Sequence, residues 1–180
     1  MKRALLTLVL LIILSPIFAN TTISSGIETS MFYHPSFDLS GTDALLMRSA
    51  HGTRITIIPF DLKMNNMDFS LNTSFIIVSP SITYNNIRNR GYIGIDLGLG
   101  FNYHFNDNLS TKINLAVGAL ELGEADQEEA YFLSSFITNF KIYQKDSASF
   151  SLLLPFNIIY RKQLLATTIG IGIKVNMDWI

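Results

Sequence analysis

Strict alternation of large apolar and small polar residues is the feature that most constrains this chain. From Tyr92 to Phe105 every second residue is large and apolar, and the residues between are mostly Gly, Asn or Asp. The segment from Leu165 to Trp179 repeats this pattern. Successive side chains of a β-strand point to opposite faces, so each segment predicts a strand with one apolar and one polar face.

Six less regular segments bring the number of predicted strands to eight. The predicted strands are 21–34, 53–64, 67–78, 92–105, 109–121, 130–144, 147–160 and 165–179. The segment 130–144 carries large apolar residues on both faces. No segment of the mature chain has a dominant helical period, so the expected fold class is all-β.

Two prolines interrupt these segments. In 53–64, Ile55 has the same parity as Asp61, so an apolar face becomes a charged one near Pro59. Proline removes a ladder hydrogen bond, and we therefore expect a bulge or a strand end at Pro59 and at Pro155.

The composition of the polar face indicates that lipid covers the apolar one. Charged residues are only 15% of the chain, against about 25% in a soluble protein. A soluble barrel would present Lys, Glu and Asp to water, whereas this polar face is mainly Gly, Ser, Thr and Asn, which suit a narrow lumen. We predict an eight-stranded, antiparallel, up-and-down transmembrane β-barrel.

Aromatic residues give a second argument, because they fall into two sets at opposite strand ends. The first set is Phe69, Tyr103, Phe105, Phe140, Tyr143, Phe150 and Trp179. The second set is Tyr33, Tyr92, Tyr131 and Tyr160. Amphipathic rings gather at the two membrane–water boundaries, so the two sets predict two girdles.

Connection lengths give a third argument. On one side the expected turns are tight, at residues 65–66, 106–108 and 145–147. On the other side they are mostly longer, at 35–52, 79–90, 122–130 and a short 161–163. Short periplasmic turns, longer extracellular loops and two periplasmic termini are the expected arrangement.

The N-terminus has the features of a secretory signal. Lys2 and Arg3 precede an apolar run over 4–14, and Ala19 offers a cleavage site. The alternative is a membrane anchor, but the run is shorter than the roughly 20 residues that a spanning helix needs. The expected division of the chain is a signal peptide at 1–19 and one outer-membrane β-barrel domain at 20–180.

The last predicted strand carries the most specific resemblance. Its alternating apolar residues end in an aromatic: Ile171, Ile173, Val175, Met177 and Trp179. In this pattern the chain resembles the small outer-membrane barrels of the OmpX, OmpA-transmembrane and OmpW type, and its low charge and many Asn and Ile residues resemble small barrels of spirochaetes. The resemblance implies that the barrel-assembly machinery reads this strand as its signal. It carries over no ligand-binding residue.

Charged residues on the polar faces are expected in the lumen. They are Glu28, Arg54, Asp68, Asp96, Lys112 and Lys174. Eight strands enclose an interior that side chains fill. We expect a network of ion pairs and hydrogen bonds that holds the barrel together, with a narrow polar pathway as the alternative.

The first long loop suggests an apolar ligand. Ser40 and Asp43 have the spacing to cap a short helix that contains Leu45, Leu46 and Met47. An apolar helix at a barrel mouth suits a ligand such as a fatty acid. The alternative is that these side chains fold inward as a plug.

Several classes of function are excluded or disfavoured. The net charge of −1 gives no basic surface for nucleic acid. No cysteine is present, and the acidic loop 122–130 does not match an EF-hand, so we expect neither a metal nor a cofactor. No histidine and serine combine in a pattern typical of barrel lipid hydrolases, so an enzyme is not expected.

Three hypotheses follow. The first is an outer-membrane protein that supports envelope integrity and assists uptake of small apolar nutrients such as fatty acids. The second is a surface adhesin whose external loops bind a host protein. The third, which we disfavour, is a lipid-modifying enzyme. The expected partners are outer-membrane lipid and the barrel-assembly machinery, with a fatty acid or a host protein according to the hypothesis.

Overall fold

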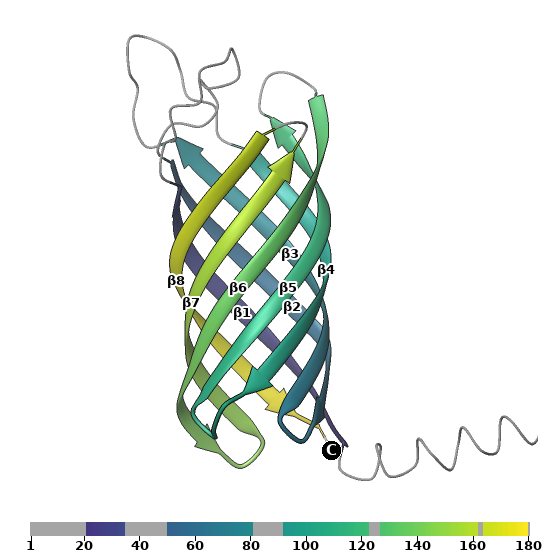
Figure 1. The fold of residues 1–180 in the computed structure, drawn as a ribbon, viewed down its shortest axis with the longest axis vertical. Coiled ribbons are helices and arrows are strands. Elements are labelled where there is room, and N and C mark those ends of the chain that lie inside the picture. The colour runs from purple at the N-terminus through teal and green to yellow at the C-terminus, as the bar shows by residue number, and fades with distance from the viewer. Residues whose placement is uncertain (1–20, 35–49, 81–91, 123–126, 162–163, 180) are drawn as a thin grey trace, which may run out of the picture.

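The computed structural model describes residues 21–34, 50–80, 92–122, 127–161 and 164–179. These residues form eight strands: β1 (Thr21–His34), β2 (Ala50–Met64), β3 (Met67–Pro80), β4 (Tyr92–His104), β5 (Leu109–Leu122), β6 (Gln127–Lys145), β7 (Ala148–Arg161) and β8 (Leu164–Asp178). Each strand pairs antiparallel with the next, and β8 returns to β1 to close the barrel (Figure 1). The predicted fold class and strand number are confirmed.

Two regions of the sequence analysis lie outside the described residues. They are the expected signal peptide at 1–19 and the segment that contains Leu45, Leu46 and Met47. Within the described part of the chain, no helix is long and apolar enough to cross a membrane.

The strands are longer at one end than the sequence predicted. β2 begins at Ala50, and β6 begins at Gln127, inside the expected acidic loop 122–130. Glu128 lies opposite Glu121 in the β5–β6 ladder. The prediction ended the strands where the apolar alternation ends, but backbone pairing continues past that point with polar side chains.

The outward face of the barrel is apolar and the inward face is polar or small. On β4, Leu97 is 57% exposed and Leu99 67% exposed, whereas Asp96 and Gly98 between them are buried. A continuous belt of exposed aliphatic side chains is unstable against water but suits the hydrocarbon of a bilayer. Lipid is therefore the solvent for this face.

A bulge in β2 confirms the interpretation of Pro59. Against β1, Gly26 lies opposite Ile58 but Ser24 lies opposite Asp61, so β2 holds one extra residue between these pairs. The ladder with β3 shifts over the same stretch.

This extra residue explains the irregular alternation of β2. Ile55 and Ile57 face lipid before the bulge, and Phe60 faces lipid after it. The inward parity changes with it, so Asp61 is buried in the lumen although it has the parity of Ile55. The bulge keeps the charged half of the strand away from hydrocarbon.

The expectation of a bulge or strand end at Pro155 was wrong. β7 continues through Pro155, and its register on β8 is the same on both sides: Leu153 lies opposite Gly172 and Phe156 opposite Ile169. Pro155 also stays in the β6–β7 ladder, opposite Ile137. A proline whose missing donor falls at one point of a ladder leaves the register intact.

Exposed aromatic rings lie near both strand ends, as predicted, but Phe150 and Tyr131 differ from the prediction, and the side chain of Tyr92 lies outside what the structure describes. Exposed rings of the first set are Phe69, Tyr103, Phe105, Phe140, Tyr143 and Trp179. Phe150 of this set is half-buried. Exposed rings of the second set are Tyr33 and Tyr160. Tyr131 does not belong to a girdle, because its ring is buried in the lumen and its hydroxyl donates to Asp96.

A charge on the lipid-facing belt tests the assignment of lipid as solvent. Leu97→Arg, near the middle of β4, is expected to lower the free energy of unfolding in vesicles by about 2–4 kcal/mol, because hydrocarbon solvates the guanidinium poorly. Phe105→Arg, at the rim, is the control and should cost about 0–1 kcal/mol. Denaturant unfolding followed by tryptophan fluorescence measures both. Equal costs at the two positions would contradict a bilayer around β4.

Candidate functional site

The lumen holds the charged side chains of the barrel. All six residues that the sequence placed there are buried: Glu28, Arg54, Asp68, Asp96, Lys112 and Lys174. They do not form one continuous chain of contacts. The structure brings them into three separate groups along the lumen.

The first group surrounds the guanidinium of Arg54. Its Nη2 atom lies 2.9 Å from both carboxylate oxygens of Asp96, and it also donates to Ser74. Tyr131 donates to Asp96 Oδ2 at 2.8 Å. These residues come from β2, β3, β4 and β6, so the group joins strands that are not neighbours in the sheet.

The second group joins two carboxylates and two ammonium groups. Lys112 Nζ lies 2.8 Å from Glu28 Oε1, and Lys174 Nζ lies 3.6 Å from the same oxygen. Lys174 also lies 3.7 Å from Asp61. The four charges balance, which is the condition under which buried charges are tolerated.

The third group lies at the end with the short turns. His104 Nε2 is 2.6 Å from Asp68 Oδ2, and Asn102 donates to the same oxygen at 3.0 Å. Asp68 is buried, whereas His104 is about one quarter exposed. This group therefore lies between the interior of the lumen and the solvent.

Sequence reasoning placed two members of these groups on the wrong face of the barrel. Asp61 was given the parity of the lipid-facing Ile55, and Tyr131 was assigned to a girdle. The phase change at Pro59 was the signal that could have placed Asp61. No pattern in the sequence indicated Tyr131, because β6 has large apolar residues on both faces.

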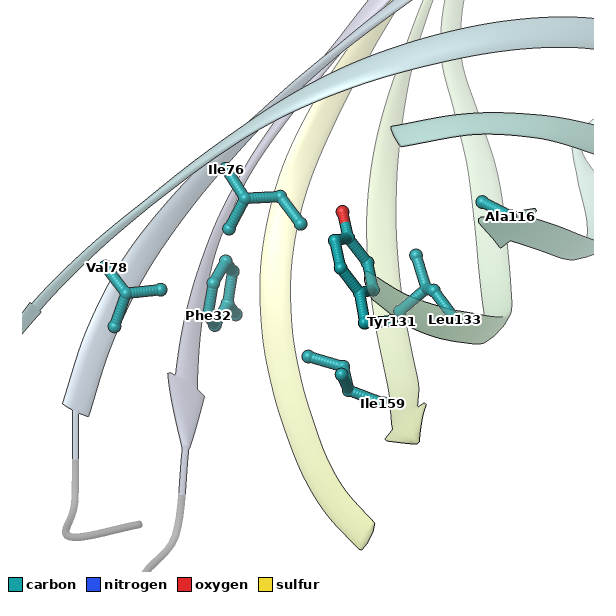
Figure 2. Close-up of a cluster of buried hydrophobic side chains, with 7 residues drawn as sticks. All are labelled: Phe32, Ile76, Val78, Ala116, Tyr131, Leu133 and Ile159. Carbon is teal, nitrogen blue, oxygen red and sulfur yellow. The ribbon is translucent and has the colours of Figure 1, made fainter. Parts of the chain in front are cut away.

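An apolar cluster fills the lumen at the end with the longer connections. Seven buried side chains from five strands gather inside the barrel (Figure 2): Phe32, Ile76, Val78, Ala116, Tyr131, Leu133 and Ile159. A Cβ atom on Gly52 would lie 2.2 Å from the ring of Phe32, so glycine is required for this packing. The cluster accounts for two of the large inward residues of β6, Tyr131 and Leu133.

The opposite end of the lumen contains a polar cavity of about 320 Å³. Its lining includes Asp61, Asp68, His104 and Lys174, together with the turn at 65–66. Within the described residues, no group of three or more His, Asp or Glu side chains has the arrangement of a metal site. The cavity is a polar recess at one end of the lumen. The Arg54 group and the apolar cluster lie farther along the lumen.

The residues of the expected assembly signal lie on the outer face. Ile171, Ile173, Val175 and Met177 of β8 are exposed. Trp179 extends the seam, which is the pairing of β8 with β1. Its backbone N–H donates to Ile23 O at 2.8 Å, and its Nε1 donates to Ser25 Oγ at 2.9 Å.

No family model and no curated protein matches this chain. Among solved structures, the Neisserial surface protein A is similar with a TM-score of 0.64 and 11% identity over 87% of this chain and 97% of that one. The Yersinia pestis outer-membrane protein Ail in a nanodisc gives a TM-score of 0.50 and 13% identity over 86% and 99%. The chain has the fold of the small eight-stranded outer-membrane β-barrels. At these identities the similarity shows the fold, and the side chains of the lumen are this chain's own.

The Arg54–Asp96 pair allows a test of how a barrel of this fold is held together. Asp96→Asn leaves a buried guanidinium without its counter-charge and is expected to lower the free energy of unfolding by about 3–5 kcal/mol. Adding Arg54→Met removes the unpaired charge and should restore most of the loss. Denaturant unfolding of the purified protein in detergent measures the three proteins. A double variant as unstable as Asp96→Asn would show that the charge is not the cause.

Proposed function

We propose that the protein is an integral outer-membrane β-barrel that is sealed and supports the integrity of the envelope. The observation that carries this proposal is that buried side chains fill the lumen. The Arg54 group crosses it, and the apolar cluster around Phe32 and Leu133 fills the space beyond. A barrel that spans the membrane and conducts no ions stiffens the envelope and adds no leak to it.

The closure has a clear physical basis. A hydrated ion entering from the polar cavity would have to separate the Arg54–Asp96 pair, and breaking a buried pair costs several kcal/mol. It would then lose most of its hydration among Ile76, Leu133 and their mainly apolar neighbours. Both barriers act in series on the same path.

Uptake of fatty acids is the second part of the proposal. An acyl chain has no favourable route through a lumen that holds Glu28, Lys112 and Lys174 at its centre, because it would have to displace their paired charges. Transfer would therefore use the lipid-facing surface. We also propose that both termini lie in the periplasm and that the longer connections lie outside the cell. The signal peptide is cleaved after Ala19.

A surface adhesin is the alternative. It would bind a host protein through the external connections, which include the segments 35–49 and 123–126. The sealed lumen is equally compatible with that role, since an adhesin needs only a rigid base. We propose no catalytic role for the three groups of the lumen.

Conductance distinguishes a sealed barrel from a pore. In a planar bilayer at high salt, the unaltered protein should give no stable channel steps. A variant with Phe32→Ala, Leu133→Ala, Arg54→Ser and Asp96→Ser removes both barriers and is expected to conduct. Leu97→Ala, on the outer face, is the control and should stay silent. Steady conductance of the unaltered protein would contradict the closed lumen.

The role in the envelope is tested in cells. A deletion strain should be more sensitive to detergent, and the unaltered gene should restore resistance. The conducting variant should insert to the same level, as judged by heat-modifiability on gels, yet restore resistance poorly because it leaks. Normal resistance of the deletion strain would remove the envelope role. Full rescue by the conducting variant would show that sealing is not what matters.

A further inference from the structure

The outer surface carries a groove near the end with the longer connections. It has a volume of about 630 Å³, within the roughly 300–1,000 Å³ of small-molecule sites. The side chains that form it come from β1, β2, β3 and β8: Met31, Tyr33, His51, Ile77, Ile169 and Ile171. All six are exposed and outward-facing, so the groove opens to the bilayer and not to the lumen.

Two inward-facing positions in the lining of the groove are glycines. Gly52 and Gly170 lie in its lining, and neither tolerates a larger residue. A Cβ atom on Gly170 would lie 2.5 Å from the carbonyl oxygen of Met31, and one on Gly52 would meet the ring of Phe32.

The groove is polar at one end only. Tyr33 and His51 lie next to the strand ends, with ring centroids 5.4 Å apart. Met31 and Ile171 lie opposite each other farther along the ladder, toward the centre of the membrane. Tyrosine at a strand end marks the membrane–water boundary. The groove therefore runs from that boundary into the hydrocarbon.

The hydrogen-bond donors at the polar end of the groove suit an anion. The lining contains a phenol and an imidazole, both of which donate hydrogen bonds, and it contains no Asp or Glu among the described residues. The remaining lining residues are apolar apart from Thr53. A few convergent donors at the end of an apolar groove match an amphiphile with a small anionic head.

We propose that this groove binds a free fatty acid from within the membrane. Its carboxylate accepts hydrogen bonds from Tyr33 and His51, and its single chain lies along Met31, Ile77 and Ile171. This inference deepens the proposed uptake function and rests on it, because it supplies the route that the sealed lumen denies to an acyl chain. The site is lateral, so the ligand enters and leaves through the bilayer.

Quenching by brominated lipids tests the site. The only tryptophan, Trp179, is first replaced by Phe, and a reporter is then introduced as Ile77→Trp in the wall of the groove. Phe132→Trp on β6 is the matched control, three strands from β3 round the barrel, with 43% exposure against 51% for Ile77. Both proteins are placed in phosphatidylcholine vesicles that contain either dibrominated oleate or dibrominated phosphatidylcholine.

The proposal expects dibrominated oleate to quench the groove reporter at clearly lower mole fraction than the control reporter. Adding Tyr33→Phe and His51→Phe should weaken that association about ten-fold, as expected for the loss of two hydrogen bonds. The phosphatidylcholine should quench both reporters alike. Heat-modifiability confirms that every variant is folded.

Three results would overturn the inference. Equal quenching by oleate at both reporters would show ordinary boundary lipid only. Stronger quenching by the phospholipid than by oleate in the groove would show the wrong ligand. No effect of the Tyr33 and His51 substitutions would remove the carboxylate site. Normal fatty-acid uptake by a deletion strain, with specific quenching intact, would instead refute the uptake function and leave the site.

Discussion

Every strand of this protein depends on the pairing of β1 with β8. Hydrocarbon offers no partner to a backbone N–H or C=O group, so an open sheet edge cannot exist within a bilayer. Residues 24–33 of β1 pair with β8, and this seam removes the last open edge of the sheet. Trp179 extends the seam past the end of β8 through its contacts with Ile23 and Ser25. Closure then defines an inside, and the lumen follows from it.

The inside is organised in layers that differ in chemistry. A polar recess at one end, balanced charges at the centre, the Arg54 group beyond them and an apolar cluster at the far end succeed one another. Pairing across the lumen joins strands that share no backbone hydrogen bonds, for example β1 and β5 through Glu28 and Lys112. The charges therefore brace the barrel across its width. In the function that we propose, the same side chains also prevent passage, so rigidity and sealing have one cause.

Alternation in the sequence predicted the fold because lipid imposes period two on every strand. It placed Asp96 and Lys112 inward, since β4 and β5 keep a constant phase. It misplaced Asp61, because one extra residue near Pro59 reverses the alternation of inward and outward residues. It misplaced Tyr131, because an aromatic ring suits a girdle and the apolar cluster of the lumen equally well. The partners within the lumen were not predictable, since contacts across a barrel depend on its shear and not on sequence spacing. The groove beside Tyr33 was missed because it needs side chains from four strands.

The pairing of β1 with β8 also determines when the barrel can form. Since β1 and β8 are neighbours, the barrel cannot close until β8 is available to pair with β1. Until the barrel is closed and inserted, the apolar stripes that include Leu97 and Ile171 are not covered by lipid. A chain with so few charges is prone to self-association in that state. The unclosed chain must therefore be kept from aggregating until β8 pairs with β1.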